Sequence, residues 1–314
     1  MRNLRRSVAI VMGVVSMSVG AAVPAGAGTP PMPRFDLDGD GIGDLAVTRP
    51  GAGDLLVTHW SRSRRGPASF EHGPQLGSYP LTGDWDGDGR TEQAFWVADE
   101  GQLHVGQDPF GPRWGRLGDD PNVIADYDGD GRTDFAVYRP GSPSTWFVHG
   151  STGSDQVVQW GEAGDRPVPG DYDGDGKADI AVAWAGTDGT LYFFIRPSSG
   201  GFEFVNFGDA TDAVVPGDFD GDGVTDIAVT RDVGGILTWF VRRSTGGMSV
   251  HQFGNSATDH EVPEDYDGDG RTDVAVWREQ SPGTFFILQS SNGQMRTHAW
   301  GEPGDYPSAH LYVR

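Results

Sequence analysis

Short runs of apolar residues alternating with small or polar ones recur along the chain about every 47 residues, and no segment repeats with the period of a helix. In the first run of each unit, such as Phe135-Ala-Val137, large side chains face one side of a strand and alanine faces the other. A second β-rich run follows a turn containing glycine or serine. The first runs are Leu45–Val47, Gln93–Phe95, Phe135–Val137, Ile180–Val182, Ile227–Val229 and Val274–Val276, and the second runs are Leu55–Trp60, Gln102–Val105, Thr145–His149, Leu191–Arg196, Leu237–Arg242 and Phe285–Gln289. The pattern predicts strands throughout and excludes solenoids of helix pairs.

A third run in each unit ends in an apolar residue followed by glycine. These pairs are Leu76-Gly77, Leu117-Gly118, Trp160-Gly161, Phe207-Gly208, Phe253-Gly254 and Trp300-Gly301. A short fourth run, such as Val168–Asp171, leads into the next unit. Four short strands per unit are typical of a propeller blade. The sequence from residue 34 to residue 314 therefore predicts one all-β domain, a β-propeller of six four-stranded blades, with seven blades as the alternative.

The C-terminal segment predicts how the ring closes. Residues 300–307 match residues 160–167, but the chain ends at Arg314 without a further acidic loop. We expect residues 308–313 to form a strand beside the N-terminal segment near Arg34 and Phe35. Such pairing would leave no exposed sheet edge.

One nine-residue acidic loop precedes the first run of every unit, and the six loops are 36–44, 84–92, 126–134, 171–179, 218–226 and 265–273. Carboxylates at positions 1, 3, 5 and 9 would repel one another strongly without a cation between them. Oxygen ligands in this number suit Ca²⁺ better than Mg²⁺, and no loop contains the Cys or His that zinc or copper prefers. An EF-hand is excluded, because position 12 is always apolar and lies in a predicted strand.

We predict up to six Ca²⁺ sites, each formed by the side chains at positions 1, 3, 5 and 9 and the main-chain carbonyl at position 7. The predicted ligands are Asp36, Asp38, Asp40, Ile42, Asp44, Asp84, Asp86, Asp88, Arg90, Glu92, Asp126, Asp128, Asp130, Arg132, Asp134, Asp171, Asp173, Asp175, Lys177, Asp179, Asp218, Asp220, Asp222, Val224, Asp226, Asp265, Asp267, Asp269, Arg271 and Asp273.

The first 27 residues have the pattern of a signal peptide. Residues 1–6 are basic, residues 7–23 are mostly apolar, and small residues precede a predicted cleavage after Ala27. Residues 28–33 would then form a short linker before the propeller. We therefore expect secretion and no membrane span in the mature chain. The chain has no cysteine, so we expect bound metal ions to stabilise the fold in place of disulfides.

The formal net charge is −22, and the six loops hold 24 of the 45 acidic residues. Six Ca²⁺ ions would still leave the mature chain acidic. This charge disfavours nucleic acid and anionic membranes as partners.

The remaining residues carry no recognisable catalytic motif and no motif for an organic cofactor. The acids outside the loops, Asp99, Glu100, Glu203 and Glu302, leave a glycosidase pair open. Arginines at 49, 139, 231 and 278 recur at one position in the repeat, which favours a salt bridge closing each blade over a ring of free cations. We expect most of the 10 tryptophans to pack between blades.

The loop, the apolar-Gly pair before it and the length of the unit together resemble the FG-GAP repeats of integrin α-subunit propellers. They are still more similar to the FG-GAP-like or VCBS repeats of secreted bacterial proteins. The resemblance implies a propeller with a Ca²⁺ loop in each blade. It departs from the family in having six units instead of seven, and Val-Pro-Gly, Leu-Thr-Gly or Val-Pro-Glu in place of Gly-Ala-Pro.

Members of that family include adhesion modules, sugar-binding lectins and accessory domains of hydrolases, so the resemblance fixes the scaffold more firmly than the function. We expect a monomeric extracellular module for carbohydrate binding or cell adhesion, with a glycan or a protein as partner. A secreted hydrolase or lyase acting on polysaccharide, or an accessory protein for one, is the alternative.

Overall fold

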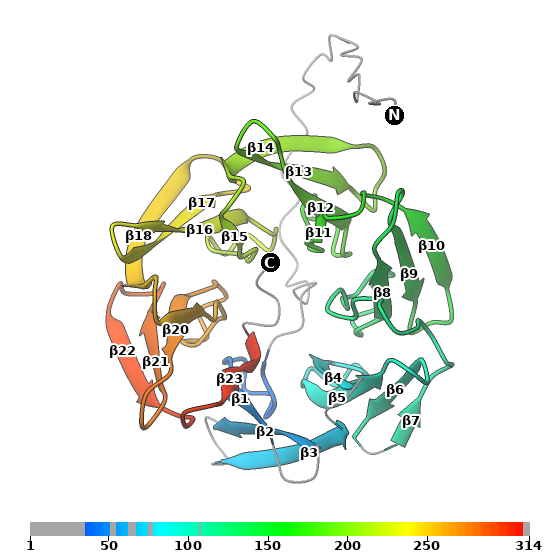
Figure 1. The fold of residues 1–314 in the computed structure, drawn as a ribbon, viewed down its shortest axis with the longest axis horizontal. Coiled ribbons are helices and arrows are strands. Elements are labelled where there is room, and N and C mark those ends of the chain that lie inside the picture. Colours follow the sequence, from blue (N-terminus) through cyan, green and yellow to red (C-terminus); the bar gives the residue numbers. More distant parts are fainter. Residues whose placement is uncertain (1–34, 51–54, 62–66, 75–77, 107, 310–314) are drawn as a thin grey trace.

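The computed structural model describes residues 35–309 apart from 51–54, 62–66, 75–77 and 107. The predicted signal peptide and linker, residues 1–33, lie outside the described residues. Six antiparallel sheets stand around a central axis (Figure 1). The prediction of a six-bladed all-β propeller is confirmed.

The blades follow one another in chain order around the ring. Blade 1 contains β23 (Tyr306–Pro307), β1 (Leu45–Pro50), β2 (Leu55–Ser61) and β3 (Ala68–Pro74). Blade 2 contains β4 (Ser78–Gly83), β5 (Glu92–Val97), β6 (Gln102–Val105) and β7 (Asp108–Phe110). Blade 3 contains β8 (Phe135–Arg139), β9 (Thr145–His149) and β10 (Asp155–Gln159).

The second half of the ring repeats this order. Blade 4 contains β11 (Arg166–Pro167), β12 (Ile180–Ala185), β13 (Thr190–Arg196) and β14 (Glu203–Asp209). Blade 5 contains β15 (Ala213–Val214), β16 (Ile227–Val233), β17 (Ile236–Arg242) and β18 (Met248–Asn255). Blade 6 contains β19 (Asp259–Glu261), β20 (Val274–Arg278), β21 (Thr284–Leu288) and β22 (Met295–Ala299). In blade 3 an isolated bridge, Asp120 to Tyr138, replaces the innermost strand, so this blade has three strands instead of the predicted four.

Ring closure differs from the prediction in position and partner. The closing strand is β23, and it pairs with β1 through Thr48–Tyr306 and Val47–Pro307 instead of with residues 34–35. Ser308 and Ala309 already form a 3₁₀ turn, and residues 310–313 lie outside the described residues. Blade 1 therefore combines strands from both ends of the chain (Figure 1).

Two further strand predictions need correction. In blade 2 the outer strand ends at Phe110, and Leu117-Gly118 lies in a turn. The reason is local: Gly111 has φ 66°, a left-handed conformation, and Pro112 has no N–H to continue the ladder. In blade 4 the innermost strand is Arg166–Pro167, and the predicted run at residues 168–171 contributes the bridge Gly170–Asp179 and the hydrogen bond from Val168 N to Ala181 O at 2.9 Å.

The core lies between adjacent blades. Trp96, Trp146, Trp239 and Trp277 are fully buried, and each packs against apolar residues of the following blade. Three further indoles cross the blade boundary as hydrogen-bond donors, from Trp114 to Phe147 O at 3.2 Å, from Trp160 to Phe194 O at 3.0 Å and from Trp300 to His59 O at 3.3 Å. The expectation that most tryptophans pack between blades is confirmed.

A ring of acidic loops as candidate metal site

Each acidic loop is wound around the carboxylate at its first position. In the third loop, Asp126 Oδ1 accepts hydrogen bonds from Gly129 N (2.6 Å) and Asp130 N (3.2 Å), and its Oδ2 accepts one from Gly131 N (2.8 Å). Gly129 and Gly131 have φ of 77° and 86°, which side chains disfavour. The same three bonds occur in all six loops, at Asp36, Asp84, Asp126, Asp171, Asp218 and Asp265.

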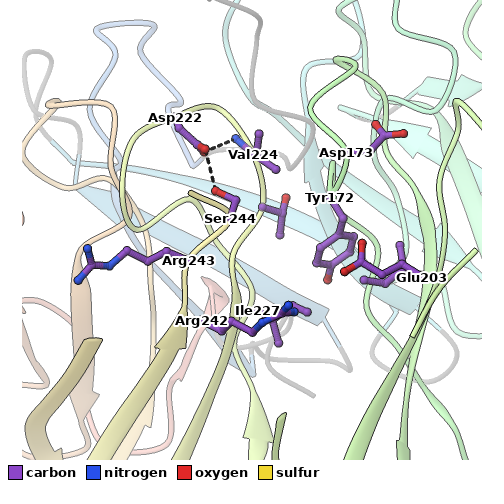
Figure 2. Close-up of a pocket in the computed structure, with 11 residues that line it drawn as sticks. Tyr172, Asp173, Glu203, Asp222, Val224, Ile227, Arg242, Arg243 and Ser244 are labelled. Atoms are coloured by element: carbon purple, nitrogen blue, oxygen red, sulfur yellow. Dashed lines mark hydrogen bonds between the residues drawn. The ribbon is translucent and has the colours of Figure 1, made fainter. Parts of the chain in front are cut away.

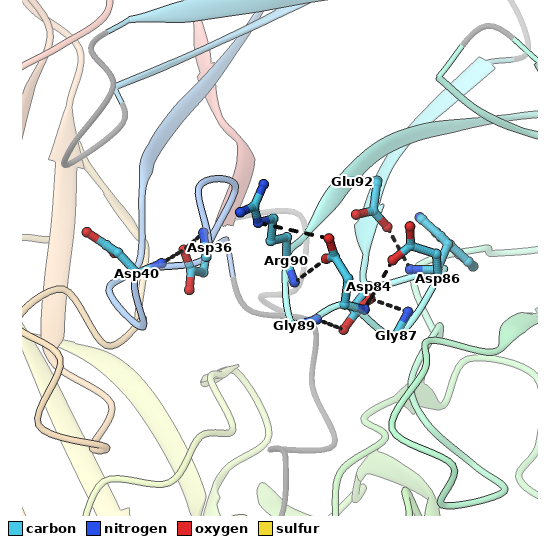
Figure 3. Close-up of polar contacts among 11 residues, drawn as sticks. Asp36, Asp40, Asp84, Asp86, Gly87, Gly89, Arg90 and Glu92 are labelled. Carbon is cyan, nitrogen blue, oxygen red and sulfur yellow. Dashed lines mark hydrogen bonds and ion pairs between the residues drawn. The ribbon is translucent and has the colours of Figure 1, made fainter.

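The carboxylate at position 9 closes the loop from the strand that follows. Asp134 is fully buried, and its two oxygens accept hydrogen bonds from Tyr127 N (2.8 Å) and Ser151 N (2.6 Å). Glu92 replaces aspartate in the second loop, and its longer side chain reaches the equivalent N–H, Trp85 N, at 2.8 Å. Figure 3 shows Glu92 turned toward the loop carboxylates.

The carboxylate at position 3 has an oxygen without a partner in three of the loops. The Oδ1 atoms of Asp128, Asp220 and Asp267 are buried and accept no hydrogen bond. An unpaired buried acceptor costs about 1–3 kcal/mol, and more when it is charged. In five loops, oxygens of three or four carboxylates, always including positions 1 and 3, lie within 4.8 Å of one another. Such a cluster of oxygens fits a hard divalent cation.

Hydroxyl groups cover four of the loops, and they come from the hairpin between the two outer strands of the same blade. These hydroxyls were not predicted from the sequence. In blade 3, Ser151 Oγ donates to Asp130 at 2.6 Å and Thr152 Oγ1 to Asp128 at 2.5 Å. The equivalent pairs are Ser198 and Ser199, Ser244 and Thr245, and Ser290 and Ser291. A Ser-Ser or Ser-Thr pair 17 to 19 residues after position 9 was the signal in the sequence.

Crowded, buried carboxylates hold their protons more tightly than free ones. Burial, opposed by hydrogen bonds and reinforced by repulsion from neighbouring loop carboxylates, raises the pKa of Asp134 and Asp179 to about 7. The same causes raise the pKa of Glu92 to about 7 and those of Asp226 and Asp273 to about 6. Full ionisation at neutral pH therefore destabilises the loops unless a cation compensates the charge.

The six loops are joined into a closed ring by main-chain hydrogen bonds. The N–H at position 8 of each loop donates to the carbonyl at position 1 of the preceding loop, as in Thr133 N to Asp84 O at 2.7 Å. The other bonds start from Thr91, Ala178, Thr225 and Thr272, and Gly43 N to Asp265 O at 2.7 Å joins the first loop to the last. Position 7 also lies over the preceding loop, where Arg90 covers Gly39 (Figure 3).

Close packing at these junctions depends on complementary residue sizes. Gly83, which precedes the second loop, has no room for a side chain because Thr133 fills that space, and Gly170 and Gly217 face Thr225 and Thr272 in the same way. At the closing junction the sizes are exchanged. Glu264 takes the place of the glycine, and Gly43 takes the place of the threonine. The family pattern Gly-Ala-Pro is replaced here by Val262-Pro-Glu264. Gly43 of the first loop leaves the space that Glu264 fills.

In five loops the structure groups the predicted ligands of positions 1 and 3, together with position 9 in the second to fifth loops and with position 5 in the first and second. Asp44, Asp130, Asp175 and Asp222 are not part of these groups. The donor set suits a hard cation such as Ca²⁺ because every group is an oxygen. The carbonyl oxygens of Ile42, Arg90, Arg132, Lys177, Val224 and Arg271 stay predicted ligands.

Residues 126–182 and 171–229 each match the family model described as the FG-GAP-like repeat. Each match runs from the start of one acidic loop into the strand after the next loop, and the same loop and strand order recurs in all six blades. The chain is a propeller that contains FG-GAP-like repeats.

Solved structures similar to the FG-GAP propeller are distant. A mutant of the Aleuria aurantia lectin in complex with Fucα1-6GlcNAc is 11% identical over 83% of this chain and 96% of its own, with a TM-score of 0.46. A mutant of AofleA from Arthrobotrys oligospora is 14% identical over 81% of each chain, with a TM-score of 0.48. No curated protein matches the sequence. Likeness at this level says nothing about what the propeller binds.

The recurring arginines close the blades of the FG-GAP propeller, as expected. Arg139 forms a bidentate pair with the buried Asp119, both bonds at 2.8 Å, and its guanidinium lies 4.2 Å from the ring centre of Phe147. The equivalent pairs are Arg49 with Asp305, Arg231 with Asp212 and Arg278 with Asp259. These arginines are structural.

The four acids considered as a glycosidase pair are spread around the propeller. Asp99 and Glu100 lie in the turn after β5 of blade 2, Glu203 begins β14 of blade 4, and Glu302 follows β22 of blade 6. The structure therefore does not bring acids from different segments of this set together. No helix among the described residues has the length and apolarity to cross a membrane.

Proposed function

We propose that the chain is a secreted, calcium-stabilised propeller that acts as an extracellular binding module for a glycan or a protein. The observation that carries the metal assignment is the hydrogen-bonded ring of six acidic loops with unpaired buried carboxylate oxygens inside it. Ca²⁺ would neutralise the carboxylates of each loop. Because every loop is bonded to the next, ion binding in one blade would also hold its neighbours.

Concave surface between the blades supports the binding role. A groove of about 300 Å³ lies between blades 4 and 5, next to the acidic loops (Figure 2). Tyr172, Glu203, Arg242 and Arg243 line it and give it both charge signs. Rigid walls carrying a few polar groups are typical of ligand sites.

Secretion is supported by the basic and apolar segments in residues 1–27. N-terminal sequencing of protein from the culture medium should begin at Gly28. Recovery of the chain only inside the cell would contradict export.

A glycan array and a pull-down with extracellular proteins, each with Ca²⁺ and after metal removal, test the binding role. We expect a retained glycan or protein partner in Ca²⁺ and weaker retention without it. Failure of both assays with folded, Ca²⁺-loaded protein would contradict the proposal, and turnover of a polysaccharide would establish the enzymatic alternative.

A further inference from the structure

The outer hairpins of blades 3 to 6 hold the acidic loops through hydrogen bonds. In blade 5 the turn between β17 and β18 makes three such bonds to the fifth loop. Ser244 N donates to Asp226 at 2.7 Å, and Ser244 Oγ donates to Asp222 at 2.7 Å (Figure 2). Thr245 Oγ1 donates to Asp220. One short turn therefore holds the carboxylates at positions 3, 5 and 9.

At position 3 the hairpin binds only one of the two carboxylate oxygens. Thr245 donates to Asp220 Oδ2, whereas Asp220 Oδ1 is closed to solvent and accepts no hydrogen bond. Because Oδ2 is held, the carboxylate cannot turn to bring Oδ1 out to water. An oxygen of Asp220 lies within 4.8 Å of oxygens of Asp218 and Asp226, as an ion between them would require. The same division of the two oxygens occurs at Asp128, which Thr152 binds at 2.5 Å, and at Asp267, which Ser291 binds at 2.6 Å.

The second loop has no such support. The outer strands of blade 2 are joined by residues 106–107, a glycine and a glutamine, so this turn carries no hydroxyl. No hydroxyl among the described residues reaches Asp86 or Asp88, whose Oδ1 atoms accept main-chain N–H groups at 3.1 and 3.0 Å. The equivalent turn of blade 1 includes residues 62–66, which lie outside the described residues.

We propose that the hydroxyls that bind position 3 are positioning residues of the calcium sites. These hydroxyls belong to Thr152, Ser199, Thr245 and Ser291. Each acts through the carboxylate that it orients, so the third to sixth loops bind Ca²⁺ more tightly than the second. Loss of a group that orients a metal ligand typically lowers metal affinity about 10- to 100-fold. The inference rests on the proposed calcium binding and ranks its sites.

Thr245→Val tests the role of the hydroxyl, because it keeps the shape of the side chain and removes the donor. Native mass spectrometry of the full chain counts bound ions as chelator-buffered free Ca²⁺ is raised. We expect one binding step to move to about 10- to 100-fold higher free Ca²⁺, with the wild-type ion count reached at saturation. Thr245→Ser keeps a hydroxyl and should leave every step in place. Thr211→Val, at an exposed threonine in the turn before β15, is the matched control and should also shift no step.

The melting temperature of metal-free protein separates positioning from a structural role. Thr245 is exposed, so metal-free Thr245→Val should melt at the same temperature as the wild type. An equal loss of melting temperature with and without Ca²⁺ would overturn the assignment.

Asp86→Asn tests the ranking of the sites and should remove a step at high free Ca²⁺, whereas Asp267→Asn should remove one at low free Ca²⁺. The reverse order, or binding steps that Thr245→Val leaves in place, would contradict the positioning role while leaving calcium binding intact. A wild-type chain that binds no ion at millimolar Ca²⁺ would contradict the calcium proposal itself, and the positioning role with it.

Discussion

The carboxylates at position 3 of the loops show at the residue scale what a cation would contribute. The position 1 and position 9 carboxylates are already held by main-chain N–H groups, and Asp220 Oδ2 accepts from Thr245 Oγ1. Asp220 Oδ1 has no partner, although it is buried beside Asp218 and Asp226. Two carboxylates about 4 Å apart repel by about 4 kcal/mol at an effective dielectric constant of 20. A bound cation would turn this repulsion into attraction.

Asp220→Asn is therefore expected to have opposite effects with and without Ca²⁺. In the metal-free protein it removes one repelling charge, so the melting temperature should stay the same or rise. In the Ca²⁺-loaded protein it removes a ligand, and loss of that site costs about 2.7 kcal/mol when free Ca²⁺ is 100 times its Kd. Native mass spectrometry should count one ion fewer.

The matched control is Asp99→Asn, at an exposed aspartate outside the loops. It should change neither the ion count nor the difference between the two melting curves. Equal destabilisation by Asp220→Asn in both states would speak against a cation at this loop.

At the scale of elements, the junctions between loops hold the ring together. Each junction has one main-chain hydrogen bond, three of them pair a glycine with a threonine of the next loop, and at the closure Glu264 fills the space over Gly43. Glu264 also accepts hydrogen bonds from Phe35 N at 3.3 Å and from Asp265 N at 3.1 Å. The closing junction thus has the same design as the three glycine–threonine junctions with the two sizes exchanged.

Gly43→Ala tests this design, because an added Cβ would lie 2.4 Å from Glu264 Cγ. We expect a loss of about 1–3 kcal/mol in the free energy of unfolding, measured with urea, which is typical of overpacking. The double change Gly43→Thr with Glu264→Gly recreates the pair found at three other junctions and should be more stable than Gly43→Thr alone. If Glu264→Gly gives no such rescue, size complementarity does not govern the closure.

The sequence predicted the elements that repeat and missed those that depend on contacts far along the chain. The strands Gln102–Val105 and Thr145–His149 were predicted at their observed bounds, because apolar alternation and flanking glycines are local signals. The closing strand was predicted too late in the chain, because its position is set by pairing with Thr48, more than 250 residues away. The hydroxyl pairs over the loops, such as Ser244 and Thr245, come from a different strand connection, and nothing local to the loop indicates them.

At the scale of the whole molecule, the crowded loop carboxylates make the stability of the metal-free protein depend on pH. The raised pKa values of about 6 to 7 at Glu92, Asp134, Asp179, Asp226 and Asp273 mean that the folded, metal-free chain holds more protons than the unfolded chain, whose carboxyls titrate near 4. Stability falls with rising pH wherever the folded state binds more protons. The metal-free propeller should therefore lose stability between about pH 4 and pH 7.

We expect the melting temperature of metal-free protein, prepared on a chelating resin, to be several degrees lower at pH 8 than at pH 5. The Ca²⁺-loaded protein should show the reverse order, because protonation below about pH 7, where these carboxyls titrate, competes with the ion for the carboxylates. Repeating the series in 0.5 M NaCl screens repulsion between surface charges and should leave most of the effect, which arises from buried groups. A metal-free melting temperature that rises from pH 5 to pH 8 would refute the charge argument.

The most direct test of the proposed Ca²⁺ sites is the melting curve of the purified propeller before and after metal removal, with the ions counted by native mass spectrometry. We predict up to six Ca²⁺ per chain and a fall in melting temperature of at least roughly 10 °C on chelation. Added Ca²⁺ should restore the melting temperature, and Mg²⁺ should do so less well because it tolerates the large oxygen cage poorly. A melting curve that chelation leaves unchanged, with no Ca²⁺ bound at millimolar concentration, would contradict the account.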